Sequence, residues 1–304
     1  MRLSKWQGIG NDYLIIDEAE LPGELTETVI GALCDRNYGV GADGVLLHSA
    51  PSGETPEAVA RMRVFNPDGS EPEMCGNGIR MFARYLSSRG LVDGKEFVVE
   101  TLAGPMRPTL VGQYGVRVDM GLARFNSANI SPETVRITAG SGAEQTATEA
   151  VESVLEAGGA KYRFTFVDVG NPHCVIQVDD PASFDVHGVG ALVERHAFFP
   201  NRTNVEFVRV EDDGSARMRV WERGVGETKA CGTGATAVGA ALVRLGRAIS
   251  PVLVHLPGGD LTIEAVSAED EGDGAAMHAY MSGPAEESFT AEIAEDLMLR
   301  LGWR

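Results

Sequence analysis

The sequence predicts a mixed α/β fold made of two similar halves. Residues 61–86 recur as residues 217–242, at a constant offset of 156 and without a gap. Each copy opens with alternating polar and apolar residues, which is typical of a β-strand, and closes with an apolar run, which is typical of a buried helix. A repeat of strand, turn and helix favours two α/β units over one large one.

The repeated stretch has the same order of features in both copies. Arg-Met-Arg-Val is followed by an aromatic residue, Phe65 or Trp221, and then by a turn containing glycine. Ten residues after the aromatic position, Cys-Gly-X-Gly begins the helix at Cys75 and at Cys231. Neither helix has a strongly charged face, so we expect both to be buried on most sides.

Further strands and helices are predicted along the rest of the chain. Residues 3–17 indicate two strands around a Gly-Asn turn, and residues 25–35 a helix with Thr26 as its cap. A glycine-rich loop and a strand follow in residues 36–47. The remaining strands are expected at residues 96–100, 116–120, 252–255 and 261–266, and a terminal helix at residues 292–301.

The second half restates the start of the first half in weaker form. Gly170 and Asn171 precede an apolar run as Gly10 and Asn11 do, at an offset of 160. Residues 201–208 take the place of the first half's glycine-rich loop and strand. Residues 126–161, rich in Ala, Gly, Glu and Thr, are expected to be peripheral, with an exposed helix at 146–155 and a mobile loop.

The start of a buried helix suits anion chemistry. The first backbone N–H groups have no helical partners, and the macrodipole adds partial positive charge there. Such an end binds a carboxylate or phosphate and lowers the pKa of a cysteine placed on it. Two ends of this kind, at Cys75 and Cys231, predict one anion site between two thiols.

Composition excludes several classes of function. The 304 residues carry a net charge of −18 with no basic patch, so we expect no nucleic-acid partner. No apolar run is long enough for a signal peptide or a membrane span. The four cysteines lie far apart and form no CxxC pattern, which argues against a zinc site and favours a reducing cytoplasm. Cys34 and Cys174 are interpreted as small buried apolar residues.

Seven motifs together resemble the diaminopimelate epimerases: GIGNDYLIID, CDRNYGVGADG, FNPDGSEPEMCGNGIR, GNPHCV, NRTNVEF, WERGVGETKACGTGA and LPGG. The match runs in order through nearly the whole chain. It implies two pseudo-symmetric domains, residues 1–122 with 286–304 and residues 123–285, each a curved, mostly antiparallel sheet around a central helix. It also implies a cytoplasmic homodimer that epimerises LL-2,6-diaminopimelate to the meso form, between the two halves and without a cofactor or metal.

The resemblance implies roles for particular residues. Cys75 would be the base and Cys231 the acid, one on each face of the α-carbon, with His173 and Glu222 adjusting the thiols. Helix N–H groups would stabilise the charge that develops on the α-carboxylate. The residues implied in substrate binding are Asn11, Asn66, Gly76, Asn77, Asn171, Asn204, Glu222, Arg223, Gly232 and Thr233. Gly44 stands where some members carry a larger polar residue, so no side-chain contact is assigned to it.

Three other functions remain open on the residues. A proline or hydroxyproline racemase of the same architecture would also use paired cysteines, but it has no distal ammonium and carboxylate for the asparagine set and Arg223 to bind. A small-anion binding protein would not need two thiols in equivalent positions. A redox protein would cycle a Cys75–Cys231 disulfide, and would exchange no substrate α-proton with solvent.

Overall fold

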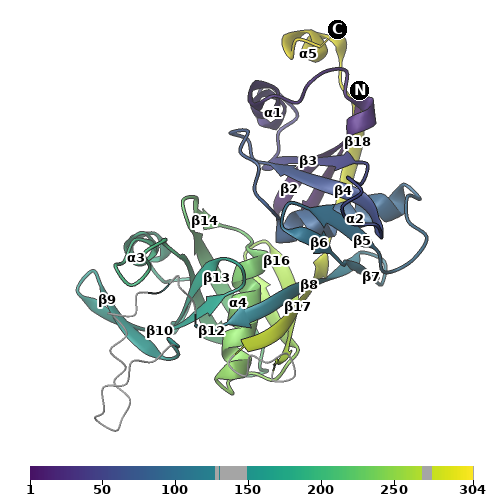
Figure 1. Cartoon of the computed structure of the whole chain (residues 1–304). Coiled ribbons are helices and arrows are strands. Elements are labelled where there is room, and N and C mark those ends of the chain that lie inside the picture. The colour runs from purple at the N-terminus through teal and green to yellow at the C-terminus, as the bar shows by residue number, and fades with distance from the viewer. Residues whose placement is uncertain (127–129, 131–148, 269–275, 304) are drawn as a thin grey trace. The chain divides into compact units, whose positions relative to one another are not determined.

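The computed structural model describes residues 1–126, 130, 149–268 and 276–303, and it confirms the predicted mixed α/β fold (Figure 1). The chain forms two compact units. Unit 1 comprises residues 1–119 and 282–304, and unit 2 comprises residues 120–281. Two strands, β8 (Gly115–Arg124) and β17 (Ala276–Pro284), contain the points where the chain passes from one unit to the other. Both chain termini belong to unit 1.

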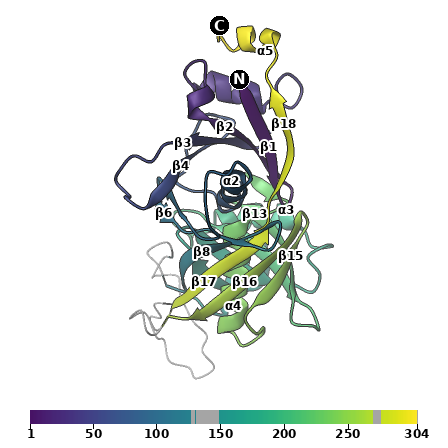
Figure 2. The same cartoon turned by 90° about the vertical axis from the view of Figure 1, so that its right-hand side faces the viewer.

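Unit 1 is a seven-stranded sheet that curves around one helix, α2 (Figure 2). The strand order is β18-β1-β2-β3-β4-β5-β6, and all neighbours are antiparallel except the pairs β2/β3 and β4/β5. The strands are β1 (Arg2–Gly8), β2 (Asn11–Asp17), β3 (Gly44–Ser49), β4 (Ala58–Phe65), β5 (Val98–Thr101), β6 (Gly104–Met106) and β18 (Glu286–Glu292), with β7 (Thr109–Val111) pairing β8.

The helices of unit 1 lie on both faces of this sheet. They are α1 (Glu27–Cys34), α2 (Gly76–Ser88), α5 (Glu295–Arg300) and a 3-10 helix (Glu18–Glu20). The Thr26 hydroxyl caps α1, as predicted, by accepting from Val29 N–H at 3.4 Å. Leu14 and Val45 pack in the cluster that includes α1, whereas Leu46, one position along β3, reaches α2. Burial of both faces explains the continuous apolar runs of β2 and β3.

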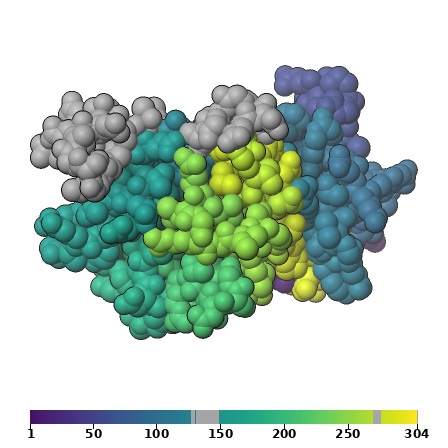
Figure 3. Space-filling view, turned by 90° about the horizontal axis from the view of Figure 1, so that it is seen from below, coloured from purple at the N-terminus to yellow at the C-terminus, as the bar shows by residue number. Residues whose placement is uncertain are grey.

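Unit 2 repeats this arrangement around α4 (Gly232–Arg244). The parallel pairs are β11/β12 and β13/β15, in the same places as β2/β3 and β4/β5 of unit 1. The strands are β9 (Ser153–Ala157), β10 (Ala160–Asp168), β11 (Pro172–Gln177), β12 (Asn204–Val210), β13 (Ala216–Glu222), β14 (Gly226–Thr228), β15 (Val252–Leu256) and β16 (Gly259–Ser267). In space-filling form, the yellow-green residues of β16 pack beside the yellow residues of β17 (Figure 3).

The two central helices are buried, as their apolar sequences predict. Nine of the thirteen residues of α2 and ten of the thirteen of α4 are buried. Strands β10 to β13, β15 and β16 all contact α4. Gly239 lets β16 approach closely, because a Cβ there would lie 2.5 Å from a methyl carbon of Ile263. Small residues in the second copy of the repeat therefore serve close helix–sheet packing.

One predicted element is wrong in its described part. The expected helix at residues 146–155 begins outside the described residues, and Ser153–Ala157 form strand β9, which pairs with β10 across a Gly158-Gly159 turn. Both glycines have positive φ, as a tight hairpin requires. One α-helix was not predicted: α3 (Val186–Glu194), whose N-cap Asp185 accepts from Gly188 N–H. The mobile loop expected within residues 126–161 falls largely outside the described residues.

Candidate active site

Cys75 is the N-cap of α2. Its backbone is extended, with φ −136° and ψ 117°, and its sulfur accepts the Gly78 N–H at 3.3 Å. Gly78 permits this approach, because a Cβ there would lie 3.1 Å from both Cys75 Cβ and Leu46 Cδ2. The Cys75 thiol also donates to the Tyr13 hydroxyl oxygen, 3.7 Å away. Cys75 thus places a half-buried sulfur at the positive end of a helix.

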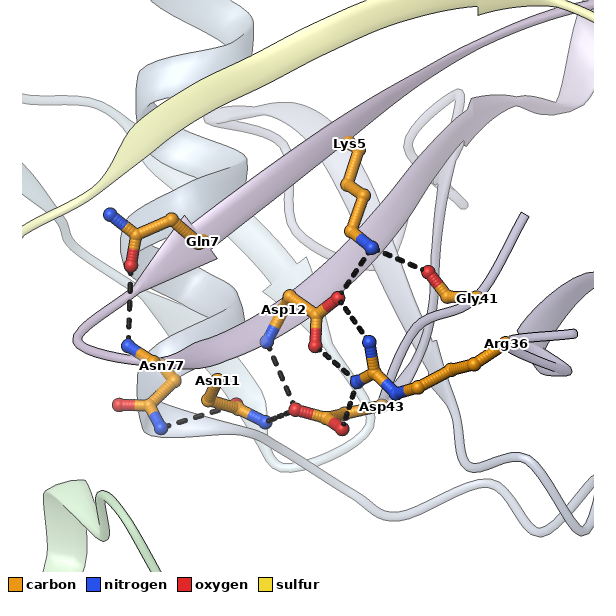
Figure 4. Close-up of polar contacts among 9 residues, drawn as sticks. Lys5, Gln7, Asn11, Asp12, Arg36, Gly41, Asp43 and Asn77 are labelled. Atoms are coloured by element: carbon orange, nitrogen blue, oxygen red, sulfur yellow. Dashed lines mark hydrogen bonds and ion pairs between the residues drawn. The ribbon is translucent and has the colours of Figure 1, made fainter. Parts of the chain in front are cut away.

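Two predicted asparagines lie beside this helix start (Figure 4). Asn77 Nδ2 donates to Asn11 Oδ1 at 3.2 Å, and Asn11 Nδ2 donates to Asp43 Oδ2 at 2.8 Å. The same Asp43 oxygen accepts the Asp12 N–H at 3.0 Å. Each amide is thus oriented by a neighbour before any ligand binds.

A charged cluster holds Asp43 in place (Figure 4). The Arg36 guanidinium donates to Asp12 at 2.6 Å and to Asp43 at 2.8 Å, and Lys5 Nζ lies 2.8 Å from Asp12. Lys5 also donates to the Gly41 carbonyl at 2.7 Å. Burial opposes ionisation of Asp12, but the bonds from Arg36 and Lys5 outweigh it and lower the pKa of that carboxyl. The cluster fixes the glycine-rich loop against β2.

Asn66 lies in the turn that follows β4. Its side-chain Nδ2 donates to Ser70 Oγ at 2.9 Å, and its backbone N–H donates to the Ser70 carbonyl at 2.9 Å. These contacts close the turn. No hydrogen bond joins Asn66 to Asn11 or Asn77, so in unit 1 the residues brought together are Asn11, Cys75, Gly76 and Asn77.

Cys231 caps α4 in nearly the same geometry. Its φ is −135° and its ψ is 111°, and its sulfur accepts the Gly234 N–H at 3.3 Å. The Thr233 hydroxyl lies 3.5 Å from the sulfur. Unlike Cys75, Cys231 is buried, with 6% of its surface exposed. Burial, followed by the charges of Glu222 and Glu206, raises the pKa of the Cys231 thiol well above its ordinary value.

A chain of hydrogen bonds leads from a buried carboxylate to this thiol. His173 Nδ1 lies 2.6 Å from Glu206 Oε1, and neither side chain is exposed. His173 Nε2 lies 3.0 Å from Asn171 Oδ1, and Asn171 Nδ2 donates to the Thr233 hydroxyl at 3.5 Å. Thr233 then contacts the Cys231 sulfur. The predicted residues Asn171, His173, Gly232, Thr233 and Cys231 are therefore brought together.

Glu222 ends β13 and accepts a hydrogen bond from the Thr228 hydroxyl of β14. Burial raises the pKa of Glu222, while its hydrogen bonds with Thr228 and with Cys231 act in the opposite direction. Glu222 is thus the second carboxylate beside the Cys231 thiol.

Asn204 and Arg223 lie close to one another. Asn204 Oδ1 accepts the Arg223 N–H at 2.9 Å, and Asn204 Nδ2 donates to the Pro172 carbonyl at 3.0 Å. The Asn204 amide therefore ties the loop after β13 to the start of β11. The Arg223 side chain is exposed and donates to the Asn201 carbonyl at 3.2 Å.

Sequence reasoning missed several residues at these helix starts: Tyr13, Asp43, Arg80, Glu206 and Thr228. Tyr13 could have been found from the repeat, since the offset of 160 that pairs Asn11 with Asn171 also pairs Tyr13 with His173. The strand registers agree, because Tyr13 lies opposite Gly44 as His173 lies opposite Asn204. By the same registers, Leu46 of unit 1 and Glu206 of unit 2 occupy equivalent positions.

Two searches concern only the residues that the structure describes. No group of three or more His, Cys, Asp or Glu side chains there is arranged to hold a metal ion. No helix in those ranges is both long and apolar enough to cross a membrane.

The chain matches a family model described as diaminopimelate epimerase over residues 3–126 and 165–287. It is 44% identical over 302 residues to the diaminopimelate epimerase of Moorella thermoacetica, a match that covers 97% of this chain and 100% of that one. The diaminopimelate epimerase of Pelotomaculum thermopropionicum is 46% identical over 299 residues, covering 96% and 98%.

A solved structure shares the fold at low sequence identity. A probable proline racemase from Agrobacterium radiobacter K84, with bound carbonate, has a TM-score of 0.65 and 16% identity, covering 97% of this chain and 93% of that one. The fold match, the family model and two relatives above 40% identity agree along nearly the full length. The chain belongs to the diaminopimelate epimerase family.

Proposed function

We propose that this protein interconverts LL-2,6-diaminopimelate and meso-2,6-diaminopimelate without a cofactor, using Cys75 and Cys231 as the two acid–base groups. One observation carries the proposal beyond family membership. Each cysteine caps a buried helix with nearly identical backbone angles, and each sulfur accepts the N–H of the glycine three residues later. Two such groups suit a two-base reaction, in which one group removes a proton from a carbon and the other delivers a proton to the opposite face.

The proposed reaction is a proton exchange at the α-carbon. The Cys75 thiolate removes the α-proton from one face, and the Cys231 thiol delivers its proton to the opposite face. The product leaves Cys75 as the thiol and Cys231 as the thiolate, so the reverse reaction uses the same groups with exchanged roles. Proton count is conserved in each direction.

Stabilisation of the carbanion is assigned to the helix ends. The N–H groups of the first helical turns, beginning at Gly76 with Asn77 and at Gly232 with Thr233, have no partners within their helices. We assign them to the substrate α-carboxylate, where negative charge grows as the proton leaves. The two carboxylates near Cys231 support its role as the group that starts protonated.

The polar set is assigned to substrate recognition. Asn11 and Asn171 are already oriented by hydrogen bonds to neighbouring side chains, which lowers the entropy lost on binding. The exposed guanidinium of Arg223 suits a carboxylate, and Glu222 suits an ammonium group. Asn66 and Asn204 complete the set, with Asn204 acting partly by holding the backbone of Arg223.

The test is proton exchange in D₂O. Reduced protein is incubated with LL-diaminopimelate and followed by NMR, beside Cys75→Ala, Cys231→Ala and the control Cys34→Ala, whose cysteine packs in the cluster around α1. We expect loss of the α-proton signal and appearance of the meso isomer in wild type and control only. Exchange with proline instead would identify the rival racemase.

Exchange with neither amino acid would overturn the proposal and favour a binding or redox function. In that event, peptide mapping under oxidant distinguishes the two, since a redox function requires a Cys75–Cys231 disulfide. All four cysteines are free thiols in this structure.

We further propose that the protein works as a homodimer in the cytoplasm, as the family resemblance implies. The chain mass is 32.4 kDa, so light scattering after size exclusion should give about twice that value. A mass equal to one chain at micromolar concentration would contradict the dimer.

A further inference from the structure

Arg80 is a fully buried cation that the reaction described above does not use. It lies in α2, five residues after Cys75, and its relative exposure is 0%. Its guanidinium donates to the Gly76 carbonyl at 3.1 Å and to Asn77 Oδ1 at 2.9 Å. Long helical side chains point toward the helix N-terminus, and these two contacts place the charge at the first turn, beside the cysteine cap.

The repeat shows that the position of Arg80 carries a charged residue in unit 1 and an uncharged one in unit 2. Arg80 corresponds to Thr236 at the offset of 156, and the Thr236 hydroxyl donates to the Gly232 carbonyl at 2.8 Å. Both side chains therefore bond the carbonyl of the first helical residue. Only Arg80 brings a charge to that place.

The strand that faces each helix start also differs between the units, but here the charged side chain belongs to unit 2. A Cβ on Gly78 would lie 3.1 Å from a Leu46 methyl carbon, whereas a Cβ on Gly234 would lie 2.9 Å from a Glu206 carboxylate oxygen. Unit 1 thus has a buried cation and an apolar side chain at its helix start. Unit 2 has a hydroxyl and a buried carboxylate in the equivalent positions.

These charges act on the two sulfurs. Burial lowers the pKa of Arg80 to about 10, and the charge of Cys75 acts on Arg80 in the opposite direction. The Tyr13 hydroxyl of β2 lies near Cys75, and the exposed Glu73 lies two residues before it in the chain. The cluster of Asp43, Asp12 and Arg36 is joined to the same helix start through Asn11 and Asn77. The facing strand β3 contributes the apolar Leu46.

We propose that Arg80 is a positioning residue that holds Cys75 in the thiolate form, while burial together with Glu222 and Glu206 holds Cys231 in the thiol form. The resting protein then carries one proton for the pair, and carries it on Cys231. This rests on the proposed function, and it adds a consequence. After a turnover that begins at Cys75, the proton lies on the disfavoured sulfur, so the buried charges drive its return to solvent and re-protonation of Cys231.

The test measures the ionisation of Cys75 without any substrate. The rate of Cys75 alkylation by iodoacetamide is followed from pH 5 to pH 10 by peptide mass spectrometry in wild type, Arg80→Met and Arg80→Lys. Removal of an adjacent opposite charge shifts a thiol by about one to three pH units. We expect the alkylation midpoint to rise by at least about one unit in Arg80→Met and by much less in Arg80→Lys.

Arg84→Met is the matched control, because it removes a charge from the same helix one turn further from Cys75. Its midpoint should stay within about 0.3 units of wild type. Equal shifts in Arg80→Met and Arg80→Lys, or no shift in either, would overturn the proposal. If Arg80→Met does not fold, Glu206→Gln tests the same device in unit 2, where the Cys231 midpoint should fall, and an unchanged Cys231 midpoint would contradict the device.

The outcome is independent of the proton-exchange assay on diaminopimelate. A shifted Cys75 midpoint with no substrate exchange would support the role of Arg80 in stabilising the thiolate and would contradict the proposed epimerase function. Substrate exchange with an unchanged Cys75 midpoint would support the epimerase function and would contradict the role of Arg80.

Discussion

Replacing His173 with leucine tests whether the buried pair beneath Cys231 stabilises unit 2. His173 and Glu206 lie 2.6 Å apart with both side chains fully buried. The second carboxylate oxygen of Glu206 has no hydrogen-bond partner in the described part of the chain. His173→Leu therefore leaves a buried carboxylate that has lost its neighbouring donor. Breaking a buried pair from one side costs about 3–5 kcal/mol, a large share of a typical folding free energy of about 5–15 kcal/mol.

Removal of both partners should cost less than removal of the histidine alone. Glu206→Leu leaves His173 bonded to Asn171, so we expect a cost of about 1–3 kcal/mol. In the double variant no polar group is stranded, and Leu46 shows that the equivalent position of unit 1 accepts leucine. The coupling between the two substitutions should then reach about 2 kcal/mol or more in the favourable direction.

Urea unfolding of the four proteins at pH 7, followed by circular dichroism and by hydrogen exchange of β12 peptides, measures these differences. Two results would refute the reasoning. One is a loss of less than about 1 kcal/mol in the free energy of unfolding for His173→Leu, because a buried carboxylate without a hydrogen-bond donor should cost more than that. The other is a double variant that loses more free energy of unfolding than the two single variants lose together, because that result would attribute the losses to packing.

Three further predictions concern unit 1. Burial raises the pKa of Cys34 from 9.0 to about 11, so its stabilising effect as a thiol is intact below pH 9 and is lost between pH 9 and 11. Urea titrations should show a loss of about 2 kcal/mol by pH 11, at most about 1.4 kcal/mol per pH unit, that is absent in Cys34→Ala. Gly44→Ala places a Cβ 2.5 Å from the Phe65 carbonyl oxygen and from the Tyr13 ring, so thermal unfolding should reveal a cost of about 1–3 kcal/mol; an unchanged transition would contradict this contact. Tyr13→Phe removes a hydrogen bond that the Cys75 thiol donates, worth about 0.5–1.5 kcal/mol, so the Cys75 alkylation midpoint should fall by about 0.4–1 pH unit, and a rise would mean that the hydroxyl favours the thiolate.

Much of the fold was readable from the repeat, because strands and buried helices have distinct apolar periods. The repeat predicted β4, β13, α2 and α4, and the Gly-Asn turn predicted the β1–β2 hairpin. Helix α3 was missed because glycines at 188 and 190 weaken its helical signal. Gly190 is there for packing, since a Cβ would lie 2.7 Å from the Trp221 side chain. Tertiary contact overrides local propensity at this helix.

The hairpin β9–β10 shows the opposite failure. An alanine- and glutamate-rich composition suggested a helix, but the alternating burial of Ser153–Ala157 and the Gly158-Gly159 turn select a strand. The turn was the better signal, because paired glycines with positive φ suit a two-residue hairpin.

The candidate site divides in the same way. Motif positions pointed to the capping cysteines, but not to Arg80 or Glu206. Those two residues act through burial, which a sequence pattern at a single position does not reveal. Only a comparison of equivalent positions in the two copies exposes the exchange of arginine for threonine and of leucine for glutamate.

Covalent fusion of two similar units gives this chain a freedom that a pair of identical subunits lacks. In a symmetric dimer of one unit, a single codon would specify the residue beneath both thiols, so a cation under one would place a cation under the other. Here Arg80 and Thr236, like Leu46 and Glu206, are encoded separately and can diverge. The two units can therefore acquire different charges at equivalent positions, one substitution at a time, although their backbones repeat.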